Sequence, residues 1–197
     1  MGNEAESEGR GQYLTLHIGG SEYVIAVRRV RQIVRYVEGF AVESAVPWIR
    51  GVVSVQGSPI PVVDLSAKLA AAPSCVTSMS CVVVVEATIQ GERIAMGILA
   101  DDVSQVIGLR AEDIAPPPKL GASIHLEYLQ GMARVGERLA LLLDVDRLLS
   151  ADETLAMAAV VEETATVLSE GGASRERQGS AAAPADPDDR PPASQPS

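Results

Sequence analysis

The amino-acid sequence predicts an all-β domain built from two small barrels. Three observations lead to this prediction. About nine or ten short apolar segments are separated by close, glycine-containing turns. One pattern of residues occurs twice along the chain, in the same order. The composition is 47% hydrophobic but only 3% aromatic, so aliphatic side chains must fill the core of this 197-residue protein.

The N-terminal part predicts a hairpin followed by an irregular segment. Residues 1–11 are predicted to be disordered. Tyr13–Ile18 alternates apolar and polar residues with a period of two, as in a half-buried strand, and Gly19–Ser21 predicts a turn before the return strand Tyr23–Ala26. Val27–Val34 changes its period, which predicts either one or two helical turns or an irregular edge strand. The four arginines of this region are interpreted as a solvated face, with an anion-binding patch as the alternative.

The segment Val46–Leu65 organises the rest of the chain. It predicts one strand at Val52–Val55, a turn at Gly57–Pro59 and a buried second strand at Ile60–Leu65. Asp64 lies near the end of the second strand, where a short carboxylate can accept hydrogen bonds from nearby backbone N–H groups.

The second half predicts similar elements. The expected strands and their turns are Ser80–Glu86, a turn at Gly91, Arg93–Leu99, a short helix or edge strand at Val103–Leu109, and a last hairpin of Tyr128–Val135 and Arg138–Val145 turned at Gly136.

Two constant offsets relate the halves of the chain. Gly51, Asp64 and Leu69 recur, all displaced by the same interval, as Gly131, Asp144 and Leu149. Val30–Ile33 recurs at a slightly shorter interval as Val103–Val106. The interpretation is two copies of one β unit, and chance similarity of short strands is the alternative.

A helix is predicted after the last hairpin. Ser150–Glu153 has the spacing of a capping box, and Met157, Val161, Ala165 and Leu168 recur at helical spacing. This apolar stripe is expected to dock on the barrels, with binding of a partner as the alternative. Gly171–Gly172 is predicted to end the helix, and the small and charged residues beyond it predict disorder.

The distribution of charge and the lack of targeting signals restrict the classes of partner and the cellular location that we expect. The net charge is −10, but residues 13–150 hold 14 acids and 12 bases, so the acidity belongs to the ends of the chain. A near-neutral core argues against nucleic acid as a partner. The acidic N-terminus is not a signal peptide, no apolar run is long enough to span a bilayer, and Cys75 and Cys81 do not have metal or redox spacing. We therefore expect a soluble cytoplasmic protein.

The sequence contains no catalytic motif. Phosphate-binding glycine loops, HExxH and Gly-x-Ser-x-Gly are all absent. His17 and His125 are the only histidines and are interpreted as structural or surface residues. Asp64 and Asp144 occupy the same place in the two repeats, which favours a structural cap over a pair of catalytic carboxylates. We expect no enzymatic activity, no cofactor and no metal.

The chain from Gln12 to Asp152 resembles the CheW family, the coupling proteins of bacterial chemosensory arrays. The resemblance rests on motifs in the family's order and spacing: Ile18–Tyr23, Val30–Ile33, Trp48–Val52, Gly57, Pro61–Leu65, Asp102–Val106, Pro116–Pro118, Tyr128–Gly131 and Leu143–Leu149.

The resemblance implies two SH3-like five-stranded barrels with a groove between them and a non-catalytic adaptor function. One surface would bind the regulatory domain of a CheA-type histidine kinase, and the groove would take the cytoplasmic tip of a chemoreceptor at a membrane-associated array, without direct insertion into the membrane. The implied organisation is a disordered N-terminus at 1–11, a CheW-like domain at 12–152 with halves at about 13–80 and 81–150, a C-terminal helix at 153–170 and a disordered acidic tail at 171–197.

By position, nine residues match sites of the family's kinase or receptor contacts. They are Val27, Val30, Gln32, Arg50, Gly51, Gln56, Gly57, Gly97 and Val106. The three glycines are expected either to let a partner backbone approach closely or to serve turns and bulges.

Gln32 and Gln56 depart from the family pattern. The family often has Glu and Arg there, and these are thought to form an ion pair. A neutral amide pair replaces it without stranding a charge. This departure suggests a specialised chemosensory pathway. The alternative function is a CheW-like scaffold that recruits a different partner through the C-terminal helix and tail.

Overall fold

The computed structural model describes residues 10–36, 46–70, 72–117 and 126–175. The chain forms two compact units, residues 1–165 and residues 166–197. Among the described residues, no helix combines the length and the apolar character needed to cross a membrane. The predicted disorder at 1–9 and 176–197 lies outside the described residues, whereas Gly11 already belongs to a strand.

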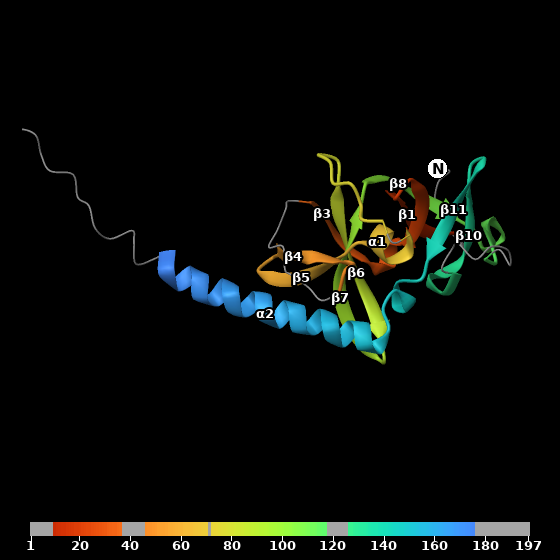
Figure 1. Ribbon diagram of the computed structural model, residues 1–197. Helices are drawn as coiled ribbons and strands as arrows, with labels where there is room; N and C mark the ends of the chain where they lie inside the picture. Colours follow the sequence, from red (N-terminus) through yellow and green to blue (C-terminus); the bar gives the residue numbers. More distant parts are fainter. Residues whose placement is uncertain (1–9, 37–45, 71, 118–125, 176–197) are drawn as a thin grey trace, which may run out of the picture. The chain divides into compact units, whose positions relative to one another are not determined.

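The first unit contains two sheets that lie side by side (Figure 1). Sheet A has six strands in the order β8-β1-β2-β11-β10-β9. They are β8 (Asp102–Leu109), β1 (Gly11–Ile18), β2 (Ser21–Ala26), β11 (Arg138–Leu143), β10 (Leu129–Val135) and the short β9 (Ile114–Ala115). Sheet B has five strands in the order β3-β6-β7-β5-β4. They are β3 (Val30–Arg35), β6 (Cys81–Ile89), β7 (Glu92–Ala100), β5 (Ser58–Val63) and β4 (Ile49–Val55).

Short helices connect the strands. The 3-10 helices are η1 (Val27–Arg29), η2 (Ala111–Asp113), η3 (Leu126–Tyr128) and η4 (Val145–Arg147), and the α-helices are α1 (Leu65–Ala70) and α2 (Ala151–Arg175). The irregular segment predicted at Val27–Val34 is therefore one 3-10 turn followed by edge strand β3. Its counterpart at Val103–Leu109 is edge strand β8.

The prediction of an all-β domain of two small barrels is confirmed in the form of two curled sheets, but these sheets do not divide the chain near residue 80. Strand β3 comes from the first half and pairs with β6 of the second. Strand β8 comes from the second half and pairs with β1 of the first. Each sheet is therefore built from both halves: β1 and β2 join β8 to β11 in sheet A, and β6 and β7 join β3 to β5 in sheet B. The two-residue β9 makes sheet A six-stranded instead of five-stranded.

The strand registers confirm the internal repeat. In the β4–β5 hairpin a bulge separates the pairs Ile49↔Val63 and Gly51↔Val62. The β10–β11 hairpin has the same bulge between Leu129↔Leu143 and Gly131↔Leu142, and every residue is displaced by the same interval. The parallel contacts Val62↔Gly97 and Leu142↔Val24 are likewise equivalent. Chance similarity of short strands does not reproduce a shared register and bulge.

The turn of the central hairpin lies one residue earlier than predicted. Gln56 and Gly57 are its two central residues and have φ values of 52° and 83°. A two-residue turn with both φ values positive matches the natural twist of a hairpin. Pro59, which the sequence places in the turn, is instead the second residue of β5. The pattern Gly-Ser-Pro thus misled because Pro also tolerates strand positions whose N atom has no ladder partner.

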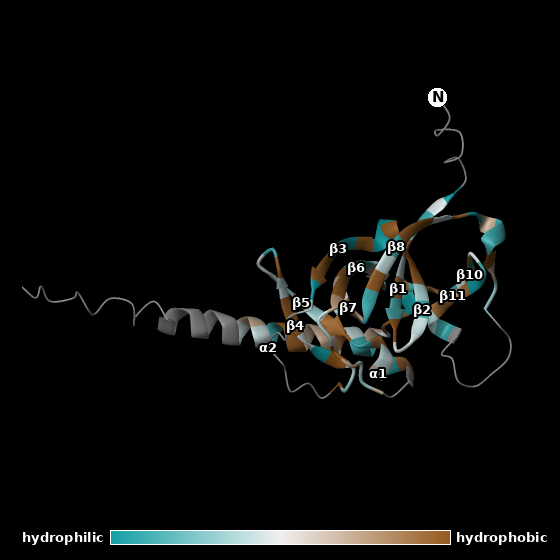
Figure 2. Ribbon diagram, turned by 90° about the horizontal axis from the view of Figure 1, so that it is seen from above, coloured by the Kyte–Doolittle hydropathy of each residue, from teal (hydrophilic) through white to brown (hydrophobic). Residues whose placement is uncertain are grey.

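Three apolar clusters hold the first unit together. The shared core contains fully buried residues from both sheets, among them Leu16, Ile25, Val83 and Ile98, and adds Leu148 after η4. Two smaller clusters belong to one sheet each: that of Val24 and Leu142 to sheet A, and that of Val62 and Val82 to sheet B. Figure 2 shows hydrophobic stretches along the strands of both sheets. Each fully buried aliphatic side chain contributes about 1.5–3 kcal/mol of transfer free energy.

Helix α2 begins as predicted but differs in its buried face and its end. Ser150 Oγ accepts from the N–H of Glu153 at 3.2 Å, and Glu153 Oε2 accepts from the N–H of Ser150 at 2.8 Å, which confirms the capping box. The buried stripe is Met157, Val160 and Thr164, while Val161 is half-buried and Ala165 is exposed. The helix also continues through Gly171–Gly172 to Arg175. Glycine costs only about 1 kcal/mol inside a helix, so it does not enforce an end.

Candidate functional site

Val27 and Val30 lie where the chain leaves sheet A and enters sheet B. Strand β2 ends at Ala26, η1 follows, and β3 begins at Val30. Both valines are half-buried and pack against the shared core. Part of each side chain is therefore accessible at the junction of the two barrels. An apolar residue that is half covered by its own core is suited to complete its burial against a partner.

Gln32 and Gln56 are brought together by the fold. Gln56 Nε2 donates to Gln32 Oε1 at 3.4 Å in an exposed setting. Gln32 belongs to β3 and Gln56 to the β4–β5 turn, so this contact joins the two edges of sheet B. A recess of about 250 Å³ opens beside the pair, and Val55 and Ile60 contribute to its lining. The recess thus combines the two amides with further polar groups, those of Arg31 and Ser58, and with a few apolar side chains.

Arg50 is committed to contacts within the chain. Its Nη2 donates to the carbonyl of Ser74 at 2.7 Å, and its Nε lies 3.3 Å from Asp64 Oδ2 in an ion pair without hydrogen-bond geometry. Asp64 is fully buried and accepts from the N–H of Ala67 and from both the N–H and the hydroxyl of Ser74. Asp144 accepts in the same way from the N–H of Asp146. The predicted capping role of both aspartates is confirmed.

The three predicted glycines serve the fold itself. Gly51 is buried at the β4 bulge with a φ of 137°, and Gly57 occupies the exposed turn. Gly97 is buried, and a Cβ at its position would lie 2.4 Å from Val82 Cγ1. The close approach at Gly97 therefore comes from a neighbouring side chain of the same sheet, which differs from the expected approach of a partner backbone.

Gly97→Ala will lower the free energy of unfolding by about 1–3 kcal/mol, because the added methyl group overlaps Val82 in a packed interior. Val82→Ala removes the overlapping atom. Chemical denaturation of both single variants and the double variant will show a loss in the double that is clearly smaller than the sum. Strictly additive losses would contradict the packing explanation.

Val106 lies apart from the other predicted residues. It is 54% exposed on β8, the edge of sheet A, and its equivalent in the repeat, Ile33, is 43% exposed on β3, the edge of sheet B. The fold thus brings Gln32 and Gln56 into contact and places Val27 and Val30 at the junction nearby in the chain. It leaves Val106 on an edge of the other sheet.

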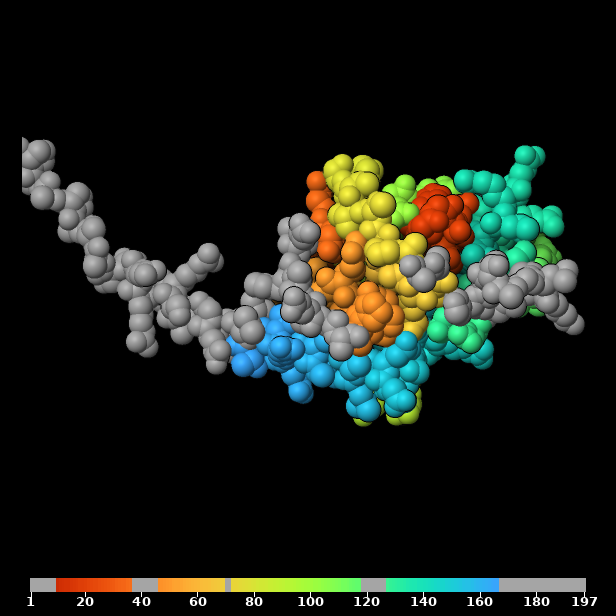
Figure 3. Space-filling view, in the orientation of Figure 1, coloured from red at the N-terminus to blue at the C-terminus, as the bar shows by residue number. Residues whose placement is uncertain are grey.

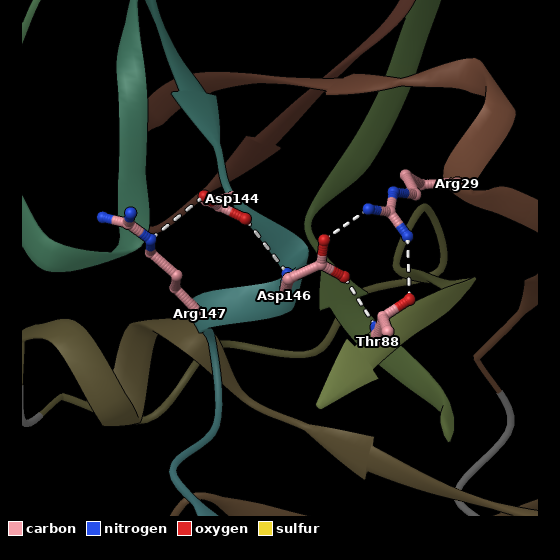
Figure 4. A network of polar contacts seen from close by, with 5 residues as sticks. All are labelled: Arg29, Thr88, Asp144, Asp146 and Arg147. Atoms are coloured by element: carbon pink, nitrogen blue, oxygen red, sulfur yellow. Dashed lines mark hydrogen bonds and ion pairs between the residues drawn. The ribbon is translucent and has the colours of Figure 1, made fainter. Parts of the chain in front are cut away.

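One polar network that joins the sheets was not predicted (Figure 4). Asp146 of η4 pairs with Arg29 of η1 and accepts from the N–H of Thr88, at the end of β6, at 2.6 Å. Arg31 pairs with Glu86. Two of the four arginines interpreted as a solvated face are therefore engaged in ion pairs. No local pattern marks this network, because its members come from segments that are distant from one another in the sequence.

A second unpredicted feature, the Lys68 cluster, consists of Lys68, Trp48, Tyr128 and Glu153. The Lys68 side chain is only 4% exposed and pairs with Glu153. Its ammonium lies 4.4 Å from the Trp48 ring centroid and 5.3 Å from that of Tyr128. The two rings are equivalent in the repeat, so one cation from α1 fills the space between the copies and binds the start of α2.

Burial and charge set the protonation of this cluster. Burial, followed by the neighbouring Glu127 and Glu153 carboxylates, raises the pKa of Tyr128 to about 12. Burial alone would raise the pKa of Glu153, but hydrogen bonds from Lys68 and Ser150 outweigh it and lower that pKa. At neutral pH Glu153 is therefore a carboxylate and Tyr128 a neutral phenol.

The chain is similar to a family of known proteins. The family model of the CheW-like domain matches residues 12–153. A chemotaxis protein CheW of Klebsiella aerogenes is 32% identical over 142 residues, which cover 72% of this chain and 83% of that protein. A probable chemotaxis protein CheW of Rhizobium etli is 24% identical over 148 residues, covering 75% and 93%. The scaffolding protein TtCheW from Thermoanaerobacter tengcongensis has a similar fold, with a TM-score of 0.61 at 21% identity, covering 69% of this chain and 85% of that one.

Proposed function

The chain belongs to the CheW-like domain family, and on that premise we propose that it is a non-catalytic adaptor that couples chemoreceptors to a CheA-type histidine kinase. The observation that carries this proposal is the pair of half-buried valines, Val27 and Val30, at the junction of two duplicated barrels. The adaptor works in the cytoplasm, at receptor arrays on the membrane.

The receptor would contribute an amphipathic helix from its cytoplasmic tip. Val27 and Val30 supply apolar contact at the junction, and Gln32 and Gln56 supply hydrogen bonds beside it. An apolar stripe with a polar rim is the usual way in which a surface accepts a helix. We expect each contact to bury no more than about 1,200 Å², with strength coming from many copies in an array.

The kinase would dock through its own CheW-like regulatory domain, barrel end to barrel end. Val106, exposed on the edge of sheet A, is the proposed contact on that side. Arg50, Gly51 and Gly97 support the site from within, since they are engaged or buried inside the first unit.

The polar side chains that were candidates for catalysis make structural contacts, which favours adaptor function over catalysis. His17 Nδ1 lies 2.7 Å from Asp102 and ties β1 to β8. Asp64 and Asp144 cap strand ends. His125 lies outside the described residues. In the described part of the chain these candidate groups are thus used for structure.

The neutral Gln32–Gln56 pair supports a specialised pathway. An ion pair at this place would attract charged partner groups, whereas two amides select by hydrogen-bond geometry. We propose that the matching receptor presents neutral polar groups here. A scaffold that recruits a different partner through α2 and the tail remains the second candidate, supported by the acidic residues of that segment.

Binding to the kinase regulatory domain and to a receptor hairpin tip will test the adaptor proposal. Val30→Asp will weaken binding of the receptor hairpin tip at least about tenfold, because a carboxylate cannot be buried against an apolar partner. Gln56→Glu, at an exposed turn, will also weaken it without disturbing the core. Leu139→Asp, 60% exposed on sheet A, is the matched control and will bind within about twofold of the unmodified chain.

Truncation separates the two candidate functions. The cut belongs after Ala165, at the boundary of the first unit, since Met157 and Val160 are buried and an earlier cut would remove core residues. Full binding by the truncated chain favours the adaptor. Binding that disappears on truncation but persists in Val30→Asp would favour the alternative scaffold.

A further inference from the structure

An apolar pocket of about 440 Å³ lies between β5, β7 and the first part of α2. Three residues of β5, three of β7 and six of α2 line it. Leu155 stands at its α2 side and is 70% exposed, the largest exposed fraction among the described large hydrophobic residues. Figure 3 shows the first part of α2 lying against the surface formed by β4 and β5.

Beside this pocket the two strands of sheet B are paired over a short length. Strands β5 and β7 pair only through Val62↔Gly97 and Val63↔Ile98. Pro59 and Pro61, just before these pairs, have no N–H to extend the ladder. The equivalent strands β11 and β2, which contain no proline, also pair only through Leu141↔Tyr23 and Leu142↔Val24, so the short pairing belongs to the fold. Residues of α2 line the pocket beside β5 and β7.

Charge defines what the pocket would accept. Of its twelve lining residues, Glu92 and Glu162 are acidic and none is basic. Asp152 and Glu163 are also exposed on α2, on another side of the helix. From residue 151 to residue 170 the sequence contains acids but no Lys or Arg. A partner that buries an apolar side chain here would gain from Lys or Arg flanking that side chain.

We propose that this pocket is a docking site for a basic amphipathic segment of a partner protein, which inserts an apolar side chain between α2 and β5. A second copy of this chain is disfavoured, because two acidic α2 helices would face each other. The chain's own tail beyond residue 175 is disfavoured as well, because it contains no large apolar residue. The site is independent of the Val27–Val30 surface, although its lining shares Ile60 and Ala95 with the recess beside Gln56.

A defined peptide tests the proposal with the full-length chain. The probe is a fluorescein-labelled peptide of about 15 residues, with two leucines four positions apart flanked by lysines, so that the leucines share one helix face. Two controls have the same length: a scrambled peptide of identical composition, and one with Glu in place of Lys. Fluorescence anisotropy measures binding, and methyl NMR of Ile94 and Leu155 locates it.

Two matched variants of α2 decide the outcome. Ala158 lines the pocket and Ala159 does not, and both are exposed on the same helix. Ala158→Trp fills the opening and will weaken peptide binding at least about tenfold, while Ala159→Trp will stay within about twofold. Glu92→Lys will also weaken binding, and added salt will reduce the affinity of the unmodified chain.

Three results would overturn the proposal. The first is equal binding by Ala158→Trp and the unmodified chain. The second is equal binding of the scrambled or the acidic peptide. The third is self-association in sedimentation that Ala158→Trp abolishes, which would assign the pocket to a second copy. Val30→Asp will leave peptide binding intact, so failure of this site and failure of the adaptor function are distinguishable.

Discussion

Replacing Asp64 with Ala will lower the free energy of unfolding by about 3 kcal/mol, and the same change at Asp144 will cost only about 1 kcal/mol. Asp64 is fully buried and accepts three hydrogen bonds, two of them from backbone N–H groups, while it also faces Arg50. Asp144 accepts one hydrogen bond from the N–H of Asp146, and its other contact is with the exposed Arg147. Urea denaturation of the two variants measures the difference.

The two aspartates form their own matched control, because the repeat places them at equivalent strand ends. Their backbone N–H groups bond to equivalent carbonyls, those of Trp48 and Tyr128, both at 2.8 Å. A difference in cost therefore reports the side-chain environment and not the position in the fold. Equal losses at the two sites would show that the loop around Ser74 adds nothing to the buried carboxylate.

The repeat explains why the fold class could be predicted from the sequence. Hairpins are local, so alternation and Gly turns are sufficient to indicate β4–β5 and β6–β7. The bulges and the parallel strand contacts also recur in the two halves at the same two constant offsets. The pairing of β3 with β6 and of β8 with β1 could not be predicted, since pairing between strands of different halves is long-range and leaves no local pattern.

For the candidate site as well, some features could be predicted from the sequence and others could not. Gln32 and Gln56 were expected to pair because the family resemblance linked them, and the 3.4 Å contact agrees. Gly97 has no distinguishing sequence context, so only the position of Val82 reveals why a side chain is excluded there. From Lys68 to Thr77 the sequence predicts a loop of small residues, whereas Lys68 lies in helix α1. A buried cation cannot be recognised until its aromatic and acidic partners are located.

Glu153→Gln will destabilise the protein by about 2 kcal/mol, whereas Lys68→Met will change its stability by less than about 1 kcal/mol. The first change leaves the Lys68 ammonium buried without a counter-charge, since its side chain is only 4% exposed. Gln still accepts hydrogen bonds and preserves the cap, so the loss reports charge. The second change places a flexible apolar chain between Trp48 and Tyr128, where sulfur contacts with the rings are favourable. Trp48 is the only tryptophan, so its fluorescence follows unfolding directly.

The asymmetry of these two variants distinguishes a charge balance from simple packing. If the ion pair matters because it neutralises a buried cation, the double variant Glu153→Gln/Lys68→Met will be about as stable as Lys68→Met alone. Because Lys68 lowers the pKa of Glu153, the contribution of the pair is present above the ordinary carboxyl pKa of 4.5 and is lost as pH falls through the lower folded pKa. The stability gap between the unmodified chain and Glu153→Gln will therefore close in acid. A gap that persists in acid far below the ordinary carboxyl pKa, or a double variant whose loss is the sum of the two, would contradict this origin and assign the cost to packing at the start of α2.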